Sequence, residues 1–231
     1  MKNLFFIFSL LIPAVGFAQL DVSLATGVGK YSMSDLKKLQ ESIRADFPVE
    51  AKITSSFPAY WFYEGTVKKR FDNNFMTGGS FSLGSTGGRI SYADYSGEIH
   101  SDQLVKFYSF AAVLGVSIKS SNQKMIYQFD VHPGITMTNL KIEFAENLNG
   151  QTSTDAINFR SINVAFQPTA SVTKRFSSIG VHTNIGYHIT ALHGRLENSD
   201  GNYIKDTFSD WSGIRVSLGL TFYFSGLETM K

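Results

Sequence analysis

Cysteine is absent from the 231-residue chain, and proline occurs only five times. Without cysteine the protein has neither disulfides nor thiolate chemistry, so hydrogen bonds and packing must hold its fold. Beyond the first residues, no run of about 20 apolar residues exists that could cross a bilayer as a helix. These absences exclude a disulfide scaffold, a thiol enzyme and a bundle of transmembrane helices.

A strong charge imbalance is also missing. The chain has 21 basic and 19 acidic residues, and its formal net charge is +2. One of the basic residues, Lys2, lies in the N-terminal segment described below, so the remainder carries 20 basic residues against 19 acidic ones. Proteins that bind nucleic acid normally show a clear basic excess. We therefore expect no nucleic-acid partner.

The N-terminal segment has the features of a secretory signal peptide. Lys2 supplies a positive charge, Leu4–Ile12 is apolar, and the small residues Gly16 and Ala18 stand at the −3 and −1 positions of a cleavage site. An uncleaved membrane anchor is the alternative, but the apolar stretch is too short to span a bilayer. We expect cleavage near Ala18 and a single domain over residues 19–231.

The segment Ser212–Phe224 shows the most informative pattern in the chain. Every second residue is apolar, from Ile214 to Phe224, and the residues between them are small, polar or charged. Side chains alternate across a strand, so one face of this strand is apolar and the other is polar. A soluble β-sandwich could carry one such strand. Recurrence of the pattern in a secreted chain favours a barrel with lipid outside and a polar lumen inside.

Eight segments carry this alternation, although the faces of the second are ambiguous because Tyr60–Tyr63 is aromatic on both sides. The predicted strands are residues 21–30, 59–69, 74–93, 104–119, 125–144, 157–174, 179–195 and 212–224. This predicts an all-β fold, an eight-stranded antiparallel up-and-down transmembrane β-barrel. In a barrel of this size side chains fill the interior, so we expect no open pore.

The connections between these strands alternate in length. Short ones fall at residues 70–73, 120–124 and 175–178, and long ones at 31–58, 94–103, 145–156 and 196–210. Outer-membrane barrels have short periplasmic turns and longer extracellular loops. With both termini periplasmic, the first connection is extracellular, and it is long. A soluble sandwich gives no reason for such strict alternation.

The first long connection contains a helix candidate at about residues 34–46. Leu36, Leu39 and Ile43 share one helical face, Ser34 is placed to cap the N-terminus, and Pro48 follows the end. We expect a short amphipathic helix that packs on the barrel rim. A membrane-surface helix and a lid are the alternatives.

Two prolines interrupt the alternating segments. Pro133 and Pro168 lie in the fifth and sixth predicted strands. Proline cannot donate to a strand ladder, and a closed barrel has no edge strand to accommodate it. We expect local bulges there, or strand ends that reach beyond the bilayer.

Aromatic residues make up 14% of the chain, and glycine is abundant at 20 residues. Aromatic side chains concentrate at the two membrane–water interfaces of transmembrane barrels. The residues that we assign to these interfacial belts are Trp61, Trp211, Tyr187, Phe222 and Phe224.

Several titratable residues fall on the predicted lumen face, namely Glu64, Asp130, His132, His182, His188 and Arg215. We interpret them as a structural network, because buried charges persist only when they are paired. A metal site is the alternative. His182 and His188 are six residues apart on one strand, roughly 20 Å, which is too far to share an ion. His132 and His182 could share one if the strand registers allowed it, but we expect no metal and no cofactor.

A candidate cation site lies around the second long connection. This segment contains Gly87, Gly88, Asp94, Glu98, His100 and Asp102, and its carboxylate oxygens could hold a divalent cation. The spacing is not that of a calcium loop, and a solvated surface loop is the preferred interpretation.

An enzyme at the outer rim would need a nucleophile, a histidine and a carboxylate close together. His193 and His100 lie near the predicted outer rim. No G-x-S-x-G motif is present, and adjacent strand residues such as Ser101 and Asp102 point to opposite faces.

The signal peptide, the eight alternating segments and the aromatic end of the last strand resemble the small outer-membrane β-barrel proteins of the OmpA/OmpX-like, Bacteroidetes-type porin family. The resemblance covers the mature chain and is one of pattern rather than of a catalytic motif. It implies that Gly219–Phe224 is the signal read by the barrel-assembly machinery. The chain departs from the family pattern in continuing with Ser225–Lys231.

This resemblance implies a location in the outer membrane of a Gram-negative bacterium, with outer-membrane lipid and lipopolysaccharide as surroundings. The favoured function is a structural or surface-interaction role through the extracellular loops, without enzymatic activity and with an unknown extracellular partner. A narrow channel or small-solute transporter, an outer-leaflet lipid-modifying enzyme and a soluble β-sandwich are the alternatives.

Overall fold

A computed structural model describes residues 19–71, 73–95, 97–122, 124–148 and 151–224. The predicted signal peptide and the tail after Phe224 lie outside the described residues. None of the helices in the described part of the chain is long and apolar enough to cross a membrane.

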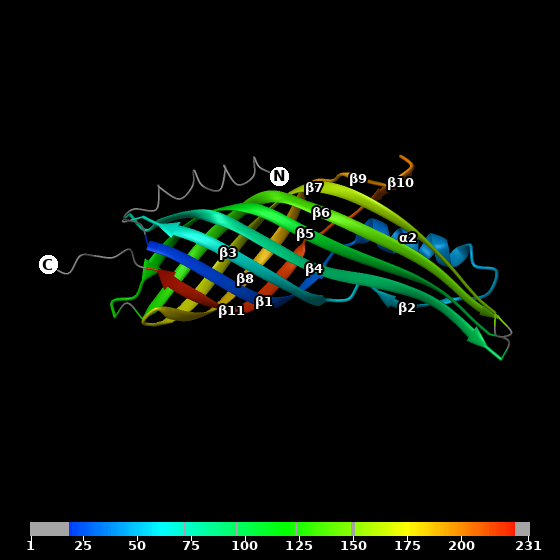
Figure 1. Ribbon diagram of the computed structural model, residues 1–231, viewed down its shortest axis with the longest axis horizontal. Coiled ribbons are helices and arrows are strands. Elements are labelled where there is room, and N and C mark those ends of the chain that lie inside the picture. Colours follow the sequence, from blue (N-terminus) through cyan, green and yellow to red (C-terminus); the bar gives the residue numbers. More distant parts are fainter. Residues whose placement is uncertain (1–18, 72, 96, 123, 149–150, 225–231) are drawn as a thin grey trace, which may run out of the picture.

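Eight antiparallel strands form a closed ring (Figure 1). They are β1 (Gln19–Tyr31), β3 (Tyr60–Arg70), β4 (Phe75–Asp94), β5 (Gly97–Lys119), β6 (Met125–Leu148), β7 (Gln151–Phe176), β8 (Ile179–Leu192) and β11 (Gly213–Phe224). Each pairs with the next in this order, and pairing of β1 with β11 closes the ring, as between Val28 and Val216. The predicted eight-stranded, up-and-down barrel is confirmed.

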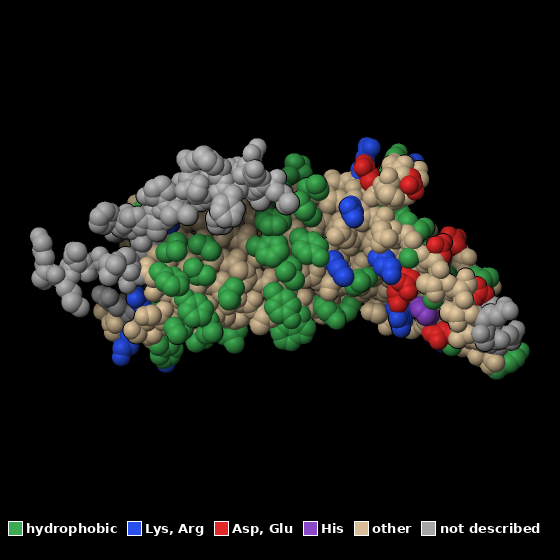
Figure 2. All heavy atoms as spheres, viewed as in Figure 1, with side chains coloured by type: hydrophobic (Ala, Val, Ile, Leu, Met, Phe, Trp, Pro, Cys, Tyr) green, Lys and Arg blue, Asp and Glu red, His purple; other side chains and the backbone are tan. Residues whose placement is uncertain are grey.

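The two faces of the barrel wall differ as the alternation predicts. Outward-facing Leu218, Phe110 and Ile162 are 57%, 49% and 60% exposed, whereas inward-facing Ser217 and Thr136 are buried. Figure 2 shows the apolar side chains as a broad band across the visible face of the barrel. An apolar exterior around a polar interior is the architecture of a transmembrane β-barrel. In water it would leave an apolar surface far larger than soluble monomers expose.

The faces of β3, which the sequence left ambiguous, are resolved by its pairing with β1 and β4. Trp61, Tyr63 and Val67 point outward, while Phe62 and Lys68 are buried in the interior. The strand therefore follows the same alternation as its neighbours despite its aromatic residues.

Strands β4, β5, β6 and β7 continue well beyond the ring as a curved sheet, here called the extension (Figure 1). Pairing runs to Asp94↔Gly97 between β4 and β5, and to Leu148↔Gln151 between β6 and β7. The predicted long loops at residues 94–103 and 145–156 are therefore wrong, because these residues are mostly strand. Beyond the bilayer a strand needs no uniformly apolar face, so the alternation that marks the barrel disappears.

The other connections match the expected lengths. The connections from β3 to β4, from β5 to β6 and from β7 to β8 are short and lie at the end opposite the extension. The first long connection holds α2 (Ser34–Ala45) and β2 (Lys52–Ser56), which pairs with the outer edge of β4. The fourth holds the small strands β9 (Arg195–Glu197) and β10 (Tyr203–Phe208).

Helix α2 lies along the inner side of the extension (Figure 1). Leu36 is fully buried, and Leu39 and Ile43 pack against the same apolar cluster, which confirms the prediction of a helix packed on the rim. The proposed cap is wrong. Met33, in a left-handed conformation with φ 47°, precedes the first turn, and no side chain caps it.

The two prolines leave the strand registers unchanged. Beside Pro133, ladder pairs are missing between Ala111↔Gly134 and Leu114↔Val131, and beside Pro168 between Phe166↔Ile189 and Thr169↔Gly186. The pairing resumes in the same register on each side. The register shift between β7 and β8 lies elsewhere, at Val164/Ala165. The expected bulges at the prolines are therefore wrong, because the wall tolerates the loss of a few rungs without an inserted residue.

Candidate functional site

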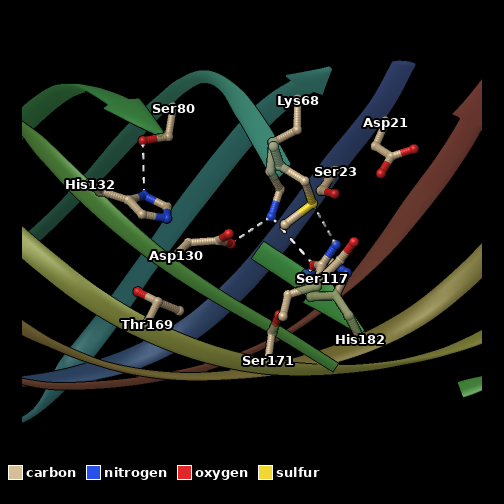
Figure 3. Close-up of polar contacts among 12 residues, drawn as sticks. Asp21, Ser23, Lys68, Ser80, Ser117, Asp130, His132, Thr169, Ser171 and His182 are labelled. Carbon is tan, nitrogen blue, oxygen red and sulfur yellow. Dashed lines mark hydrogen bonds and ion pairs between the residues drawn. The ribbon is translucent and has the colours of Figure 1, made fainter. Parts of the chain in front are cut away.

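Within the described part of the chain, the lumen holds two ion pairs between buried side chains, one between neighbouring strands and one between strands that are not neighbours. Arg70 of β3 binds Asp21 of β1 at 2.6 Å, and both side chains are almost completely buried. Lys68 donates to Asp130 of β6 at 2.8 Å, as Figure 3 shows. Both carboxylates have basic partners, which is the condition for keeping charge in an enclosed site.

Arg215 lies at the centre of the interior. Its Nη1 donates to Gln167 Oε1 at 3.1 Å and to Ser82 Oγ at 3.5 Å. The guanidinium also stacks on the Phe107 ring, 4.7 Å from its centroid, and lies 5.3 Å from the centroids of Tyr31 and Phe62. Cation–π contacts of this kind stabilise a charge away from bulk water.

The three lumen histidines bind neighbouring polar side chains rather than one another. His132 Nδ1 lies 3.2 Å from Ser80 Oγ (Figure 3), and His182 Nδ1 lies 2.9 Å from Thr221 Oγ1. His188 contacts Gln167 and Thr136 on its two ring nitrogens, at 3.4 and 3.5 Å. These contacts join strands that are adjacent or next but one in the ring.

Two small cavities remain between these groups, of about 20 and 10 Å³. Glu64 and His132 line both, His182 lines the first, and His188 and Arg215 line the second. A cavity of this size has room for roughly a single water molecule. The residues predicted for the lumen network thus surround one continuous polar region of the barrel.

The geometry offers no evident metal centre. His132 and His182 share the first cavity, yet no group of three or more ligating side chains converges anywhere in the described residues. In the extension, Asp102 is paired with Arg89 through two hydrogen bonds of 2.5 Å. This hydrogen bonding lowers the pKa of the Asp102 carboxyl below its usual range. A carboxylate already matched by a guanidinium is a poor cation ligand.

Above the polar lumen, an aromatic cluster fills the mouth of the barrel. Trp211 is completely buried, with its ring centroid 4.6 Å from that of Phe107 and 4.9 Å from that of Tyr31. Its indole Nε1 donates to Thr138 Oγ1 at 2.8 Å. The assignment of Trp211 to an interfacial belt is therefore wrong, because the chain before β11 enters the mouth instead of the lipid surface.

The other predicted belt residues face outward to different degrees. Trp61, Tyr187 and Phe224 are more than half exposed, and Phe222 is partly buried. Their location at the membrane–water interfaces stays a prediction.

Among the described residues, two histidine–carboxylate pairs lie at this end of the molecule. In the extension His100 Nδ1 is 3.4 Å from Glu98 Oε1, and at the rim His193 pairs with Asp210. His193 Nε2 lies 3.7 Å from Asp210 Oδ1, and the backbone N–H of Ser212 donates to the same oxygen at 3.0 Å. The Ser212 hydroxyl accepts from the Thr190 amide at 3.1 Å. Nucleophilic catalysis needs a hydroxyl hydrogen-bonded to the imidazole, and none of the described contacts of His193 supplies one.

Several lumen residues were missed by the sequence analysis, above all Asp21, Lys68, Arg70 and Gln167. Lys68 and Arg70 lie one and three residues after outward-facing Val67, and this spacing would place both on the lumen face of the strand. The aromatic run before them concealed which face they share. The residues that stack on Arg215 could not be found from sequence, because they come from three separate strands.

No protein-family model matches the chain, and no curated protein matches it. Among solved structures the chain is similar to Neisserial surface protein A, with 10% identity over 89% of this chain and 97% of the other, at a TM-score of 0.48. It is also similar to the attachment invasion locus protein Ail of Yersinia pestis (12% identity, 90% and 99% covered, TM-score 0.42). A third is CarO2 of Acinetobacter baumannii (13% identity, 89% and 99% covered, TM-score 0.36). The barrel assignment rests on the strand ring and its two faces rather than on these similarities.

Proposed function

We propose that the protein is a closed barrel of the outer membrane that presents the extension and α2 at the cell surface for recognition. The observation that carries this proposal is the contrast between the two ends of the molecule. The barrel interior is filled with side chains and holds buried ion pairs, whereas four strands continue beyond it as a structured, exposed sheet. The role is therefore assigned to surface interaction rather than to transport or catalysis.

The charges of the lumen support a closed state. Lys68, Arg70 and Arg215 accompany Asp21, Glu64 and Asp130 there, and the half-buried Lys119 and Arg175 also lie near Asp21. A channel needs a continuous aqueous path, but the polar region holds only cavities of about 20 and 10 Å³. The aromatic cluster around Trp211 and Phe107 lies between this region and the extension. We assign no conductance to this arrangement.

Contact with lipopolysaccharide is supported by basic residues at the upper limit of the apolar band. Tyr108, Met137 and Ile162 form one outward rung across β5, β6 and β7. The next outward rung contains Lys106 and Arg160, with Lys141 one step further along β6. Figure 2 shows blue side chains gathered beside the green band. Cations at this level would meet the phosphates of an anionic outer leaflet.

Three measurements test the main proposal. Cell fractionation should place the processed chain, cleaved near Ala18, in the outer membrane, and the purified protein should require detergent. In planar bilayers it should give no steady current. Monodisperse protein in plain buffer would disprove the membrane assignment, and stable, large single-channel currents would replace the surface role by transport.

The lipid contact has a separate test. The variant Lys106→Ala/Arg160→Ala should lose the thermal stabilisation that lipopolysaccharide-containing vesicles give relative to phosphatidylcholine vesicles. Lys205→Ala, an exposed cation of β10, is the control. Equal stabilisation of all three proteins would contradict the assignment. Recognition of Gly219–Phe224 by the barrel-assembly machinery stays a prediction.

A further inference from the structure

A groove of about 470 Å³ opens between the end of α2 and the inner face of the extension. Its apolar lining comes from both sides, with Ile43 and Phe47 at the helix end and Ile99 and Phe144 on β5 and β6. Phe144 is 36% exposed, although its neighbours on the same face, Leu140 and Ile142, are buried under the helix. Helix α2 therefore covers the inner face of β6 at Leu140 and Ile142 but leaves it uncovered at the groove, where Phe144 lies.

The groove has a strongly acidic rim. Asp46, Glu146 and Asp155 line it, and among the described residues no lysine or arginine does. Elsewhere in the extension the bias is weaker, because Asp102 and Glu143 are paired with Arg89 and Lys141. The C-terminal end of α2, at Ala45, adds the negative end of a helix dipole. The potential here favours a cationic occupant.

The groove is also bordered by an open strand edge. Along β7, residues 152–158 pair with β6 on one side only. On the other side, pairing begins with Arg160↔Glu197 of β9 and continues with β8 from Val164. All seven residues from Thr152 to Asn158 are exposed, and the Ala156 amide donates to the Asp155 side chain at 2.8 Å. An open edge presents backbone donors and acceptors that another extended chain can pair with.

We propose that the groove and the β7 edge together bind an extended, basic polypeptide segment of another protein, with an apolar side chain seated between Phe47 and Phe144. The open edge selects a peptide backbone, the rim selects cations, and the apolar floor selects an anchor residue. Lipid phosphates would be repelled by the same carboxylates. This inference rests on the proposed function, which places the extension outside the cell.

The test uses the full chain in nanodiscs and fluorescein-labelled peptides followed by anisotropy. The probe repeats Lys-Thr-Val-Thr, so that lysine and valine alternate on one strand face. Three matched peptides replace lysine by glutamate, replace valine by glycine, or N-methylate every second amide to remove backbone donors. The probe should bind, and each matched peptide should bind at least about tenfold more weakly, the equivalent of one lost contact of about 1.4 kcal/mol.

Charge reversal in the protein provides the second arm. Glu146→Lys in the groove should weaken probe binding about tenfold or more, whereas Glu143→Lys, on the opposite face of the same strand, should leave it nearly unchanged. No binding of the probe, equal binding of any matched peptide, or equal losses for the two variants would overturn the inference. Such a result would leave the fractionation and conductance outcomes untouched, so the two proposals fail separately.

Discussion

Lys68 on β3 and Asp130 on β6 form an ion pair across the lumen, with 2.8 Å between the lysine Nζ and the carboxylate oxygen. The two strands are not neighbours in the ring, so the pair connects opposite parts of the wall. Both side chains are almost fully enclosed. The interior is therefore stabilised by contacts that form only when the barrel closes.

Removing one partner of this pair should be costly. Lys68→Met would leave the Asp130 carboxylate uncompensated, and we expect a loss of about 3–5 kcal/mol in the free energy of unfolding. Urea titration in lipid vesicles, followed by tryptophan fluorescence, measures it. The double variant Lys68→Met/Asp130→Leu should recover part of the loss, and exposed Lys205→Met should have little effect. A single variant as stable as the parent would show that the pair is not required.

The two faces of β11 should respond differently to substitution. Leu218→Arg places a charge on the lipid face and should cost about 2–4 kcal/mol at the bilayer midplane. Ser217→Ala removes a buried lumen hydroxyl with no described partner and should be mild. Refolding yield and stability in vesicles compare the two variants. Equal defects would contradict the assigned sidedness of the strand.

The two tryptophans should differ in their access to lipid. Trp61 is 57% exposed on the outer wall and Trp211 is fully buried in the mouth. In the Trp211→Phe variant the remaining emission should be quenched by lipids with brominated acyl chains. In the Trp61→Phe variant it should be largely protected. Strong quenching of Trp211 would show that this residue contacts lipid and is not buried in the mouth of the barrel.

The Arg89–Asp102 pair should make the extension weakly sensitive to acid. Because the folded-state pKa of Asp102 is lowered, the pair contributes stability above the carboxyl's ordinary value of about pH 4 and loses it as the pH falls through the depressed value. Both side chains are partly exposed, so the contribution is only about 0.2–1 kcal/mol. An NMR titration of the Asp102 carboxyl carbon should show an inflection that moves upward in Arg89→Gln. An identical titration in both proteins would show that the arginine is not the cause.

The barrel was predictable because every strand that crosses the membrane must turn apolar side chains toward the lipid and polar or small ones toward the lumen. Phe110, Leu114 and Leu218 had to alternate with smaller or polar residues, and that period can be read from a single strand. The extension was missed for the same reason. Around Asp102 and Glu146 the strands leave the lipid, so the alternation of apolar and polar residues is no longer imposed on them.

The lumen network was predicted in part. His132, His182, His188 and Arg215 were assigned to the interior from their parity alone, and all are buried there. Their partners were not foreseen, since the stagger of the strands decides which side chains meet across the barrel.

Local alternation in the chain already specified how many strands cross the membrane and which side chains each one turns toward lipid, because that pattern depends on neighbours two residues apart. The placement of Trp211 against Phe107, the pairing of Lys68 with Asp130 and the open edge of β7 followed only from closure of the ring. Those contacts join residues distant in sequence, and their geometry depends on strand register and curvature that no single segment encodes.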